Sequence, residues 1–393
     1  MKILALKPSY FFPRNGGEIS LLENLNELKA RGHKVLVEGF CTPQDQIQLE
    51  SLLSQSFEAG LEDSRYELLG LKLRLHTDPL FLQHDMAAKG YFEGRIRKLI
   101  VERSPDKVLV HYTDYFAVAA ALAWDPQRTQ VRFTDNEYPR LDKLKDFPPL
   151  AKAFESIAKI QVASKFMAIE VAKDFPRAEV RRIPNWMPGL DEVNEKPSPS
   201  GEYFLFVNPV PVKGIDFLLQ LAAELSTEQF LIVGNWSGEA PQNLPPNVRF
   251  LSPQSNLKTI FARAKALLMP SVWEEAFGRL PLEAMAARVP VITSDRGNLP
   301  ETVRGGGQAL ALEIEKWKDA ISKLSSERTD WEVRGLQRIR AYREECDQVW
   351  TRQFGGRTSK TKDLPGRDLL RVHAYQQEVQ SSLDETIWEE NLV

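Results

Sequence analysis

The 393-residue sequence predicts an α/β protein in which two parallel sheets are each covered by helices on both faces. Short apolar segments with little polar alternation recur along the chain, as strands buried on both faces should. Helical patterns lie between them, which is typical of right-handed β-α-β units. A polar segment near Asn194 divides this pattern into two series. The length suits two or three domains.

The first series opens with an apolar strand at residues 3–7 and a loop of proline and glycine at residues 12–17. An amphipathic helix follows, with apolar residues at spacing three from Ile19 to Leu28, and it ends near Gly32. The predicted strands of this series cover residues 3–7, 34–37, 106–111, 131–134 and 160–164. We therefore predict a Rossmann-like N-terminal domain over residues 1–193.

The second series begins after a linker at residues 194–201, which carries prolines and no apolar periodicity. Its strands are predicted at residues 203–207, 230–233, 266–269 and 290–293, and its helices at residues 215–225, 257–264 and 282–287. This pattern predicts a second Rossmann-like domain over residues 202–335. The two domains are expected to face a central cleft, because ligands of such sheets bind at the carboxyl ends of the strands.

The chain beyond Glu315 reads as helical only. Leu336, Ile339, Cys346 and Trp350 share one helical stripe, and residues 372–387 carry a second one. We expect a helical segment at residues 336–393. Packing against the body, self-association through these helices and a mobile appendage remain the alternatives for its role.

Composition narrows the classes of function. The net charge of −3 gives no general affinity for nucleic acid or anionic membranes. The longest apolar run, residues 115–124, is far shorter than the roughly 18 to 20 residues of a membrane span. The N-terminus lacks the pattern of a signal peptide, so we expect a cytoplasmic protein. A basic cluster of Arg95, Arg97, Lys98 and Arg103 is either a solvated helix face or a site of peripheral membrane contact.

The two cysteines and five histidines are scattered, without the spacing of a disulfide framework or a metal site. We expect no metal and no cofactor.

The segment at residues 270–290, PSVWEEAFGRLPLEAMAARVP, carries the clearest chemistry. Glu275 and Glu283 flank a glycine-containing loop that leads into a helix near Pro281, and free amides at a helix start favour an anion. Two carboxylates that accept hydrogen bonds from hydroxyls beside a phosphate site suggest a sugar nucleotide. The alternative is that Glu275 is a solvated loop residue and Glu283 a partner of the helix dipole.

This segment resembles the E-x7-E signature of the retaining glycosyltransferases of the GT-B fold, in particular the large family 4, also called group 1. The resemblance implies that Glu275 contacts the donor sugar and Glu283 the ribose. It also implies that the amides of Phe277, Gly278, Arg279 and Leu280 contact the sugar and the diphosphate. Arg288 stands where the family usually has glycine.

A second resemblance lies at residues 210–216, which are similar to the family's loop that binds the donor diphosphate. Lys213 falls on the family lysine, whereas Asn208 replaces the family arginine. Asn208 therefore lacks a charge and a bidentate donor, for which Arg279 is a candidate substitute.

The N-terminal half resembles the family less strongly. Gly16 and Gly17 are similar to a glycine loop that approaches the diphosphate from the opposite domain, where a side chain would keep the backbone away. His111 ends a strand at the expected ligand edge, where it lies near the cleft or caps the next helix. Asp135 stands where many relatives have a histidine beside the reacting sugar carbon. It is a candidate to orient a hydroxyl, to accept its proton or to cap a turn.

These resemblances imply a metal-independent retaining hexosyltransferase that uses a nucleoside-diphosphate sugar and a front-face mechanism. Its catalytic candidates are Glu275, Lys213, His111 and Asp135. Two alternatives remain, namely a GT-B protein that binds sugar nucleotides or regulates a partner without turnover, and a nucleotide-sugar epimerase. The donor base, the sugar and the class of acceptor are not encoded in a readable pattern.

Overall fold

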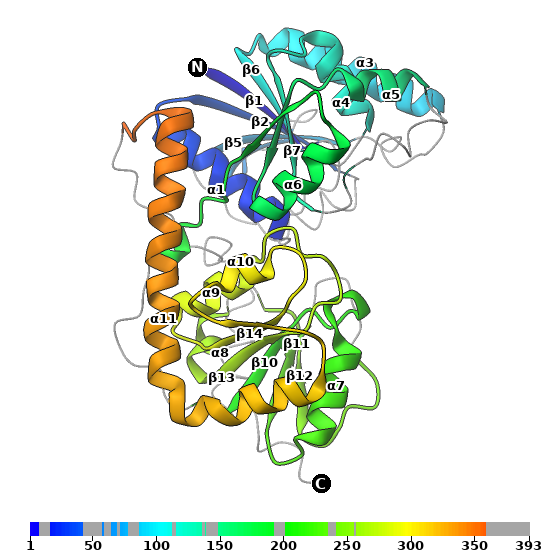
Figure 1. Ribbon diagram of the computed structural model, residues 1–393. Coiled ribbons are helices and arrows are strands. Elements are labelled where there is room, and N and C mark those ends of the chain that lie inside the picture. The colour runs from blue at the N-terminus through cyan, green and yellow to red at the C-terminus, as the bar shows by residue number, and fades with distance from the viewer. Residues whose placement is uncertain are drawn as a thin grey trace.

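The computed structural model contains two α/β domains, one above the other in Figure 1, joined along one side by a long helix. The structure describes residues 1–7, 16–41, 57–58, 64–68, 71–77, 86–111, 115–135, 138, 148–191, 201–234, 241–254 and 257–358. Most of the predicted linker and the second helical stripe at residues 372–387 lie outside these described residues.

The N-terminal domain is built on a nine-stranded sheet with the order β3-β4-β5-β2-β1-β6-β7-β8-β9. From β5 to β9 the neighbouring strands pair in parallel, whereas β3, β4 and β5 pair antiparallel. The strands are β1 (Lys2–Lys7), β2 (Lys34–Cys41), β3 (Phe57–Glu58), β4 (Ser64–Leu68), β5 (Leu71–Thr77), β6 (Lys107–His111), β7 (Thr129–Phe133), β8 (Lys159–Val162) and β9 (Glu179–Arg182). The helices are α1 (Gly16–Ala30), α3 (Met86–Arg103), α4 (Tyr115–Trp124), α5 (Pro148–Glu155), α6 (Lys165–Asp174) and the 3-10 helix η2 (Pro188–Asp191).

The C-terminal domain holds a parallel six-stranded sheet with the order β12-β11-β10-β13-β14-β15. Its strands are β10 (Tyr203–Val207), β11 (Phe230–Val233), β12 (Val248–Leu251), β13 (Ala264–Met269), β14 (Val291–Ser294) and β15 (Gln308–Leu310). Its helices are η3 (Pro211–Lys213), α7 (Ile215–Glu224), α8 (Lys258–Arg263), α9 (Arg279–Ala286), α10 (Leu299–Val303) and α11 (Ile314–Phe354). The fold prediction of two parallel, helix-covered sheets is confirmed.

Helix α11 connects the two domains. It runs along the lower domain in Figure 1, then turns and rises beside the upper domain. The indole of Trp350 donates a hydrogen bond to the carbonyl of Pro184 at 2.9 Å, and the hydroxyl of Tyr342 donates to that of Asn185 at 2.6 Å. The helix passes without a break through the boundary predicted after residue 335. Gly335 continues the helix and packs near Met285 of α9.

The sequence missed the antiparallel extension formed by β3, β4 and β5. The segment LKLRLHT of β5 alternates apolar and polar residues, unlike the uniformly apolar strands on which the prediction was based. The start of α1 also differs from the prediction, because Gly16 and Gly17 form its first turn and do not belong to the preceding loop.

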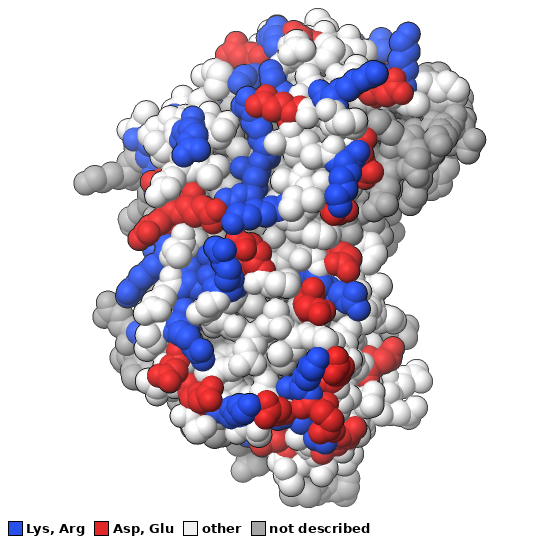
Figure 2. Space-filling view, viewed as in Figure 1, with Lys and Arg blue, Asp and Glu red and all other residues white. Residues whose placement is uncertain are grey.

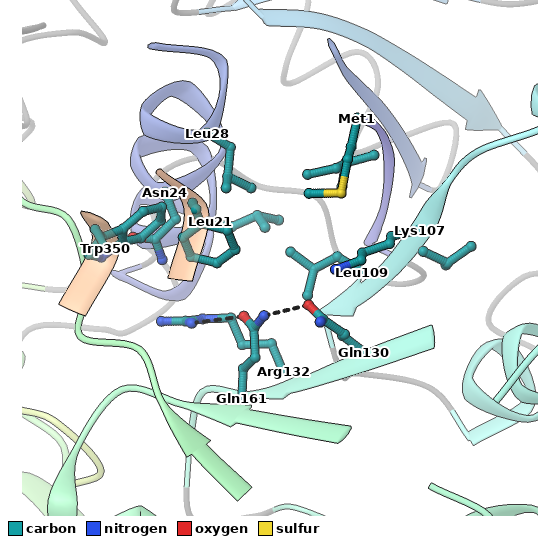
Figure 3. Close-up of a pocket in the computed structure, with 13 residues that line it drawn as sticks. Met1, Leu21, Asn24, Leu28, Lys107, Leu109, Gln130, Arg132, Gln161 and Trp350 are labelled. Atoms are coloured by element: carbon teal, nitrogen blue, oxygen red, sulfur yellow. Dashed lines mark hydrogen bonds between the residues drawn. The ribbon is translucent and has the colours of Figure 1, made fainter. Parts of the chain in front are cut away.

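A small cavity lies between α1, the N-terminal sheet and the end of α11 (Figure 3). Its volume of about 20 Å³ is room for about one water molecule. Arg132, Gln161 and Gln130 form a chain of hydrogen bonds along its wall, at 3.5 and 2.7 Å. Burial lowers the pKa of Arg132 to about 10, and its buried Nε has no hydrogen-bond partner among the residues that the structure describes.

The charge of the surface is mixed. On the face seen in Figure 2, basic and acidic side chains are interspersed over the lower domain. Within the predicted basic cluster on α3, Arg97 pairs with Glu93 at 2.7 Å and Arg103 with Glu38 at 2.5 Å. Among the described helices, none is both long and apolar enough to cross a membrane.

Candidate active site

A cleft of about 340 Å³ lies between the two domains. The carboxyl ends of strands from both sheets line it, as expected for ligand sites of parallel sheets. It brings together most of the site residues predicted from the sequence. Those that line it are Gly16, Gly17, Asp135, Asn208, Lys213, Glu275, Phe277, Gly278, Arg279 and Leu280.

Lys213 and Glu275 form the central ion pair of this cleft. The Lys213 ammonium lies 2.5 Å from a carboxylate oxygen of Glu275, and the hydroxyl of Ser271 donates to the same oxygen at 2.9 Å. Lys213 ends η3, and the following Gly214 has a φ of 85°. A Cβ at Gly214 would lie 1.8 Å from the carbonyl oxygen of Pro270, so only glycine lets this loop lie against the strand end.

The backbone around Glu275 is fixed by the loop after β14. Gly297 has a φ of 57°, and a Cβ there would lie 2.4 Å from the backbone nitrogen of Glu275. The amide of Asn298 donates to the carbonyl of Glu275 at 2.7 Å, and its side chain donates to the carbonyl of Phe277 at 3.0 Å. The sequence analysis missed this support. A glycine followed by asparagine three residues beyond a buried strand was the signal available for it.

Helix α9 begins at the cleft with Gly278 as its N-cap, at a φ of 86°. The amides of Arg279 and Leu280 fall in its first turn, where no intrahelical acceptor exists. From the other domain, the first turn of α1 brings Gly16 and Gly17 to the same cleft, and a Cβ on either would meet only open space. Two helix N-termini therefore line one cleft, an arrangement that suits an anion.

Arg279, the candidate substitute for the missing family arginine, lines the cleft as an ion-paired side chain. Its terminal nitrogens donate to both oxygens of Glu23 at 2.6 and 2.9 Å, and its Nε donates to Glu283 at 2.9 Å. Burial alone would lower the pKa of Arg279, but the carboxylates of Glu23 and Glu283 outweigh it and raise this pKa.

Two predicted site residues do not line the cleft. Glu283 lies one turn into α9 and accepts a hydrogen bond from Arg279, which does line the cleft. His111 is 2% exposed and is not among the residues that line the cleft, because the end of β6 is covered by the surrounding chain. Burial, together with the charges of Lys7 and Arg132, holds the pKa of His111 well below its usual value, so the ring is neutral.

Asp135 and Asn208 are the two site residues that stand where the family has a different residue. Asp135 follows β7 and is exposed at the cleft. Asn208 follows β10 with a φ of 71°, a left-handed conformation that asparagine tolerates better than most residues. Its amide donates to the carbonyl of Val233 at 2.9 Å. Among the described residues, no group of His, Cys, Asp and Glu side chains is arranged to hold a metal ion.

The architecture and the cleft define a GT-B protein. A glycosyltransferase from Rickettsia africae matches over 98% of this chain and 99% of its own, with a TM-score of 0.63 and 15% identity. Anabaena HepE, solved in complex with UDP and glucose, matches over 98% of this chain and all of its own, with a TM-score of 0.61 and 16% identity.

Residues 201–327 match the family described as Glycosyl transferases group 1. The D-inositol 3-phosphate glycosyltransferase of Nocardia farcinica is 31% identical over 152 residues, and that of Rhodococcus jostii is 30% identical over 186 residues. These segments cover 33% and 38% of this chain, and 34% and 41% of the relatives' own length. Residues 201–327 therefore match group 1 glycosyltransferases, which confirms the resemblance found in this part of the sequence, and the chain as a whole shares the fold of a solved glycosyltransferase.

Proposed function

We propose that this protein is a retaining glycosyltransferase that transfers a hexosyl group from a nucleoside-diphosphate sugar to an acceptor hydroxyl without a metal. The observation that carries the proposal is the meeting of two helix N-termini and the Lys213–Glu275 pair in one interdomain cleft. Amide donors and a lysine favour a diphosphate, and carboxylates beside them accept hydrogen bonds from sugar hydroxyls.

In the proposed reaction, the bond between the anomeric carbon and the diphosphate oxygen breaks while positive charge develops on the carbon. The acceptor oxygen forms its bond on the face that the diphosphate leaves, so the anomeric configuration is retained. The acceptor proton passes to the departing phosphate oxygen. Lys213 and the amides of Gly16, Gly17 and the α9 start stabilise the charge that builds on the diphosphate.

Glu275 would orient the donor sugar, and Glu283 would contact the ribose once the donor is bound. Asp135 would orient the acceptor hydroxyl, and its exposure at the cleft from the N-terminal domain supports this part of the proposal. His111 acts at most indirectly, because the structure does not bring it to the cleft surface.

A thermal-shift screen with UDP, GDP and ADP tests the donor site first. A nucleoside diphosphate at 100 times its dissociation constant is expected to add about 2.7 kcal/mol to the free energy of unfolding. UDP is the first probe, because the related Anabaena structure holds it. A protein that none of the three stabilises would contradict the proposal.

Incubation with sugar nucleotides of the selected base then identifies the reaction. We expect slow hydrolysis or transfer with the anomeric configuration kept, measured by NMR, and an unchanged rate in EDTA. Epimerised donor would identify an epimerase, and binding without turnover would identify a non-enzymatic module. Either result would overturn the proposed activity.

A further inference from the structure

Helices α1 and α9 approach the cleft from opposite domains, and both begin at it. Gly16 and Gly17 lie in the first turn of α1, and Gly278 caps α9. The N-terminal end of α1 points toward the lower domain in Figure 1. A diphosphate can accept hydrogen bonds from both ends at once only if the two helices are held at one fixed separation.

One buried ion pair joins these two helices directly. Glu23 lies in the second turn of α1, and Arg279 is the first residue of α9. The Arg279 guanidinium donates hydrogen bonds to both oxygens of the Glu23 carboxylate at 2.6 and 2.9 Å, and it also donates to the hydroxyl of Ser20 at 3.0 Å. Its Nε then holds Glu283 within the same helix at 2.9 Å.

The pair is shielded from solvent on both sides. The Arg279 side chain is 10% exposed and that of Glu23 is 1% exposed. Bidentate pairs of arginine and carboxylate are among the strongest and most directional ionic contacts in proteins. Because both charges are buried, removing Glu23 takes from Arg279 the partner of its two terminal nitrogens and leaves it only the bond from Nε to Glu283 among the bonds described above. This contact is therefore a fixed link between the two domains.

We propose that Glu23 is a positioning residue for the donor site. Its bidentate ion pair with Arg279, here called the clasp, would hold the N-termini of α1 and α9 so that both contact one diphosphate. The same Arg279 guanidinium also holds the Glu283 carboxylate through its Nε. This inference rests on the proposed function, because it assigns the purpose of the clasp to a diphosphate-bearing donor.

The opposite behaviour would follow if Glu23 competed with the donor for Arg279. Loss of Glu23 would then free a cation and tighten binding of the diphosphate. The geometry favours the clasp, because both terminal nitrogens and the Nε of Arg279 already have protein acceptors. The sign of the change in affinity separates the two roles.

The test uses calorimetry to compare how tightly the wild type and its Glu23 variants bind UDP, or whichever nucleoside diphosphate stabilises the wild type. Glu23→Gln keeps the shape of the side chain and removes its charge. We expect its dissociation constant to rise by about 10- to 100-fold, taking as the scale the loss typical when the hydrogen-bonding partner of a metal-binding side chain is removed. Donor KM should rise more than kcat falls. Glu23→Asp keeps the charge with a shorter reach, and we expect a smaller loss.

Lys165→Met is the matched control. Lys165 also makes an ion pair across the domains, with Glu301 at 2.9 Å, but neither residue lines the cleft. Its loss should change the dissociation constant less than twofold. Wild-type or tighter binding by folded Glu23→Gln and Glu23→Asp would overturn the proposal. An equal loss in Lys165→Met would also overturn it, because general weakening of the domain contact would then explain the effect.

A second measurement separates a failure of the clasp from a failure of the proposed function. If the wild type binds none of UDP, GDP and ADP, the proposed function fails, and the clasp is read from thermal unfolding. The double variant Glu23→Gln with Arg279→Gln should then lose less than the sum of the two single losses, since both break one contact. Strictly additive losses would show that no clasp exists.

Discussion

Replacing Lys213 by alanine is the most direct test of the candidate active site. Lys213 lies 2.5 Å from Glu275, so the variant removes the ammonium expected to face the diphosphate and leaves a carboxylate that is 8% exposed without its cation. Loss of one charged donor at a preorganised site costs about 3 to 4 kcal/mol of transition-state stabilisation. Turnover should therefore fall by about 10²- to 10³-fold.

The same substitution is expected to lower the free energy of unfolding by about 1 to 3 kcal/mol, because the buried carboxylate loses its partner. The hydroxyl of Ser271 still donates to Glu275 and limits this loss. The double variant Lys213→Ala with Glu275→Ala removes the unpaired charge. It should regain part of the stability and none of the activity, which separates the structural role of the pair from its catalytic role.

The assay is the release of nucleoside diphosphate from the sugar nucleotide that the ligand screen selects, together with urea denaturation. Lys265→Ala is the control, because Lys265 pairs with Glu228 at 2.6 Å in the same domain without lining the cleft. It should lose about 0 to 1 kcal/mol of stability and no activity. A Lys213→Ala variant that turns over donor at the parent rate would refute this assignment.

Three further predictions concern the support of the site and the link between the domains. Gly297→Ala should lower the free energy of unfolding by at least about 1 to 2 kcal/mol and weaken nucleotide binding. Alanine is strained at a φ of 57°, and its Cβ would meet the backbone of Glu275. Unchanged nucleotide binding in calorimetry would contradict this prediction. Trp350→Ala should cost about 3 to 5 kcal/mol in urea denaturation, because the indole is 1% exposed and bonded to Pro184; a loss below about 1 kcal/mol would mean that α11 is not anchored there. His111 has a lowered pKa in the folded chain. Its neutral form therefore contributes fully to the free energy of unfolding above about pH 6.5, and this contribution is lost as the pH falls, by up to about 1.4 kcal/mol per pH unit. His111→Gln should flatten that fall between about pH 6.5 and 5, and parallel curves for wild type and variant would rule the contribution out.

Much of the fold was readable from the chain because parallel strands buried on both faces are apolar throughout. Residues 203–207 and 230–233 were predicted with the bounds that the structure has for β10 and β11. The antiparallel strands β4 and β5 were missed, because their alternating pattern follows a different rule. The strand β15 is only three residues long, too short to carry a pattern of its own.

The cleft residues of the C-terminal domain were predictable for a related reason. Lys213, Glu275 and residues 277–280 lie in two short segments that follow strand ends and lead into helices, where local sequence determines both the turn and the helix start. Their partners were not predictable. Gly297 and Asn298 follow β14, and only the adjacency of β13 and β14 in the sheet brings them to Glu275.

Local sequence by itself determined the two parallel sheets, the loop that holds Glu275 and the helix that begins at Gly278, because spacing and turn chemistry act over a few residues. Only the tertiary structure decided what the charged groups do. Glu23 would read as a solvated helix residue, yet it is buried against Arg279 from the other domain. His111 would read as a cleft residue, yet it is covered. The burial and pairing of a charge depend on chain segments hundreds of residues away, which no local pattern contains.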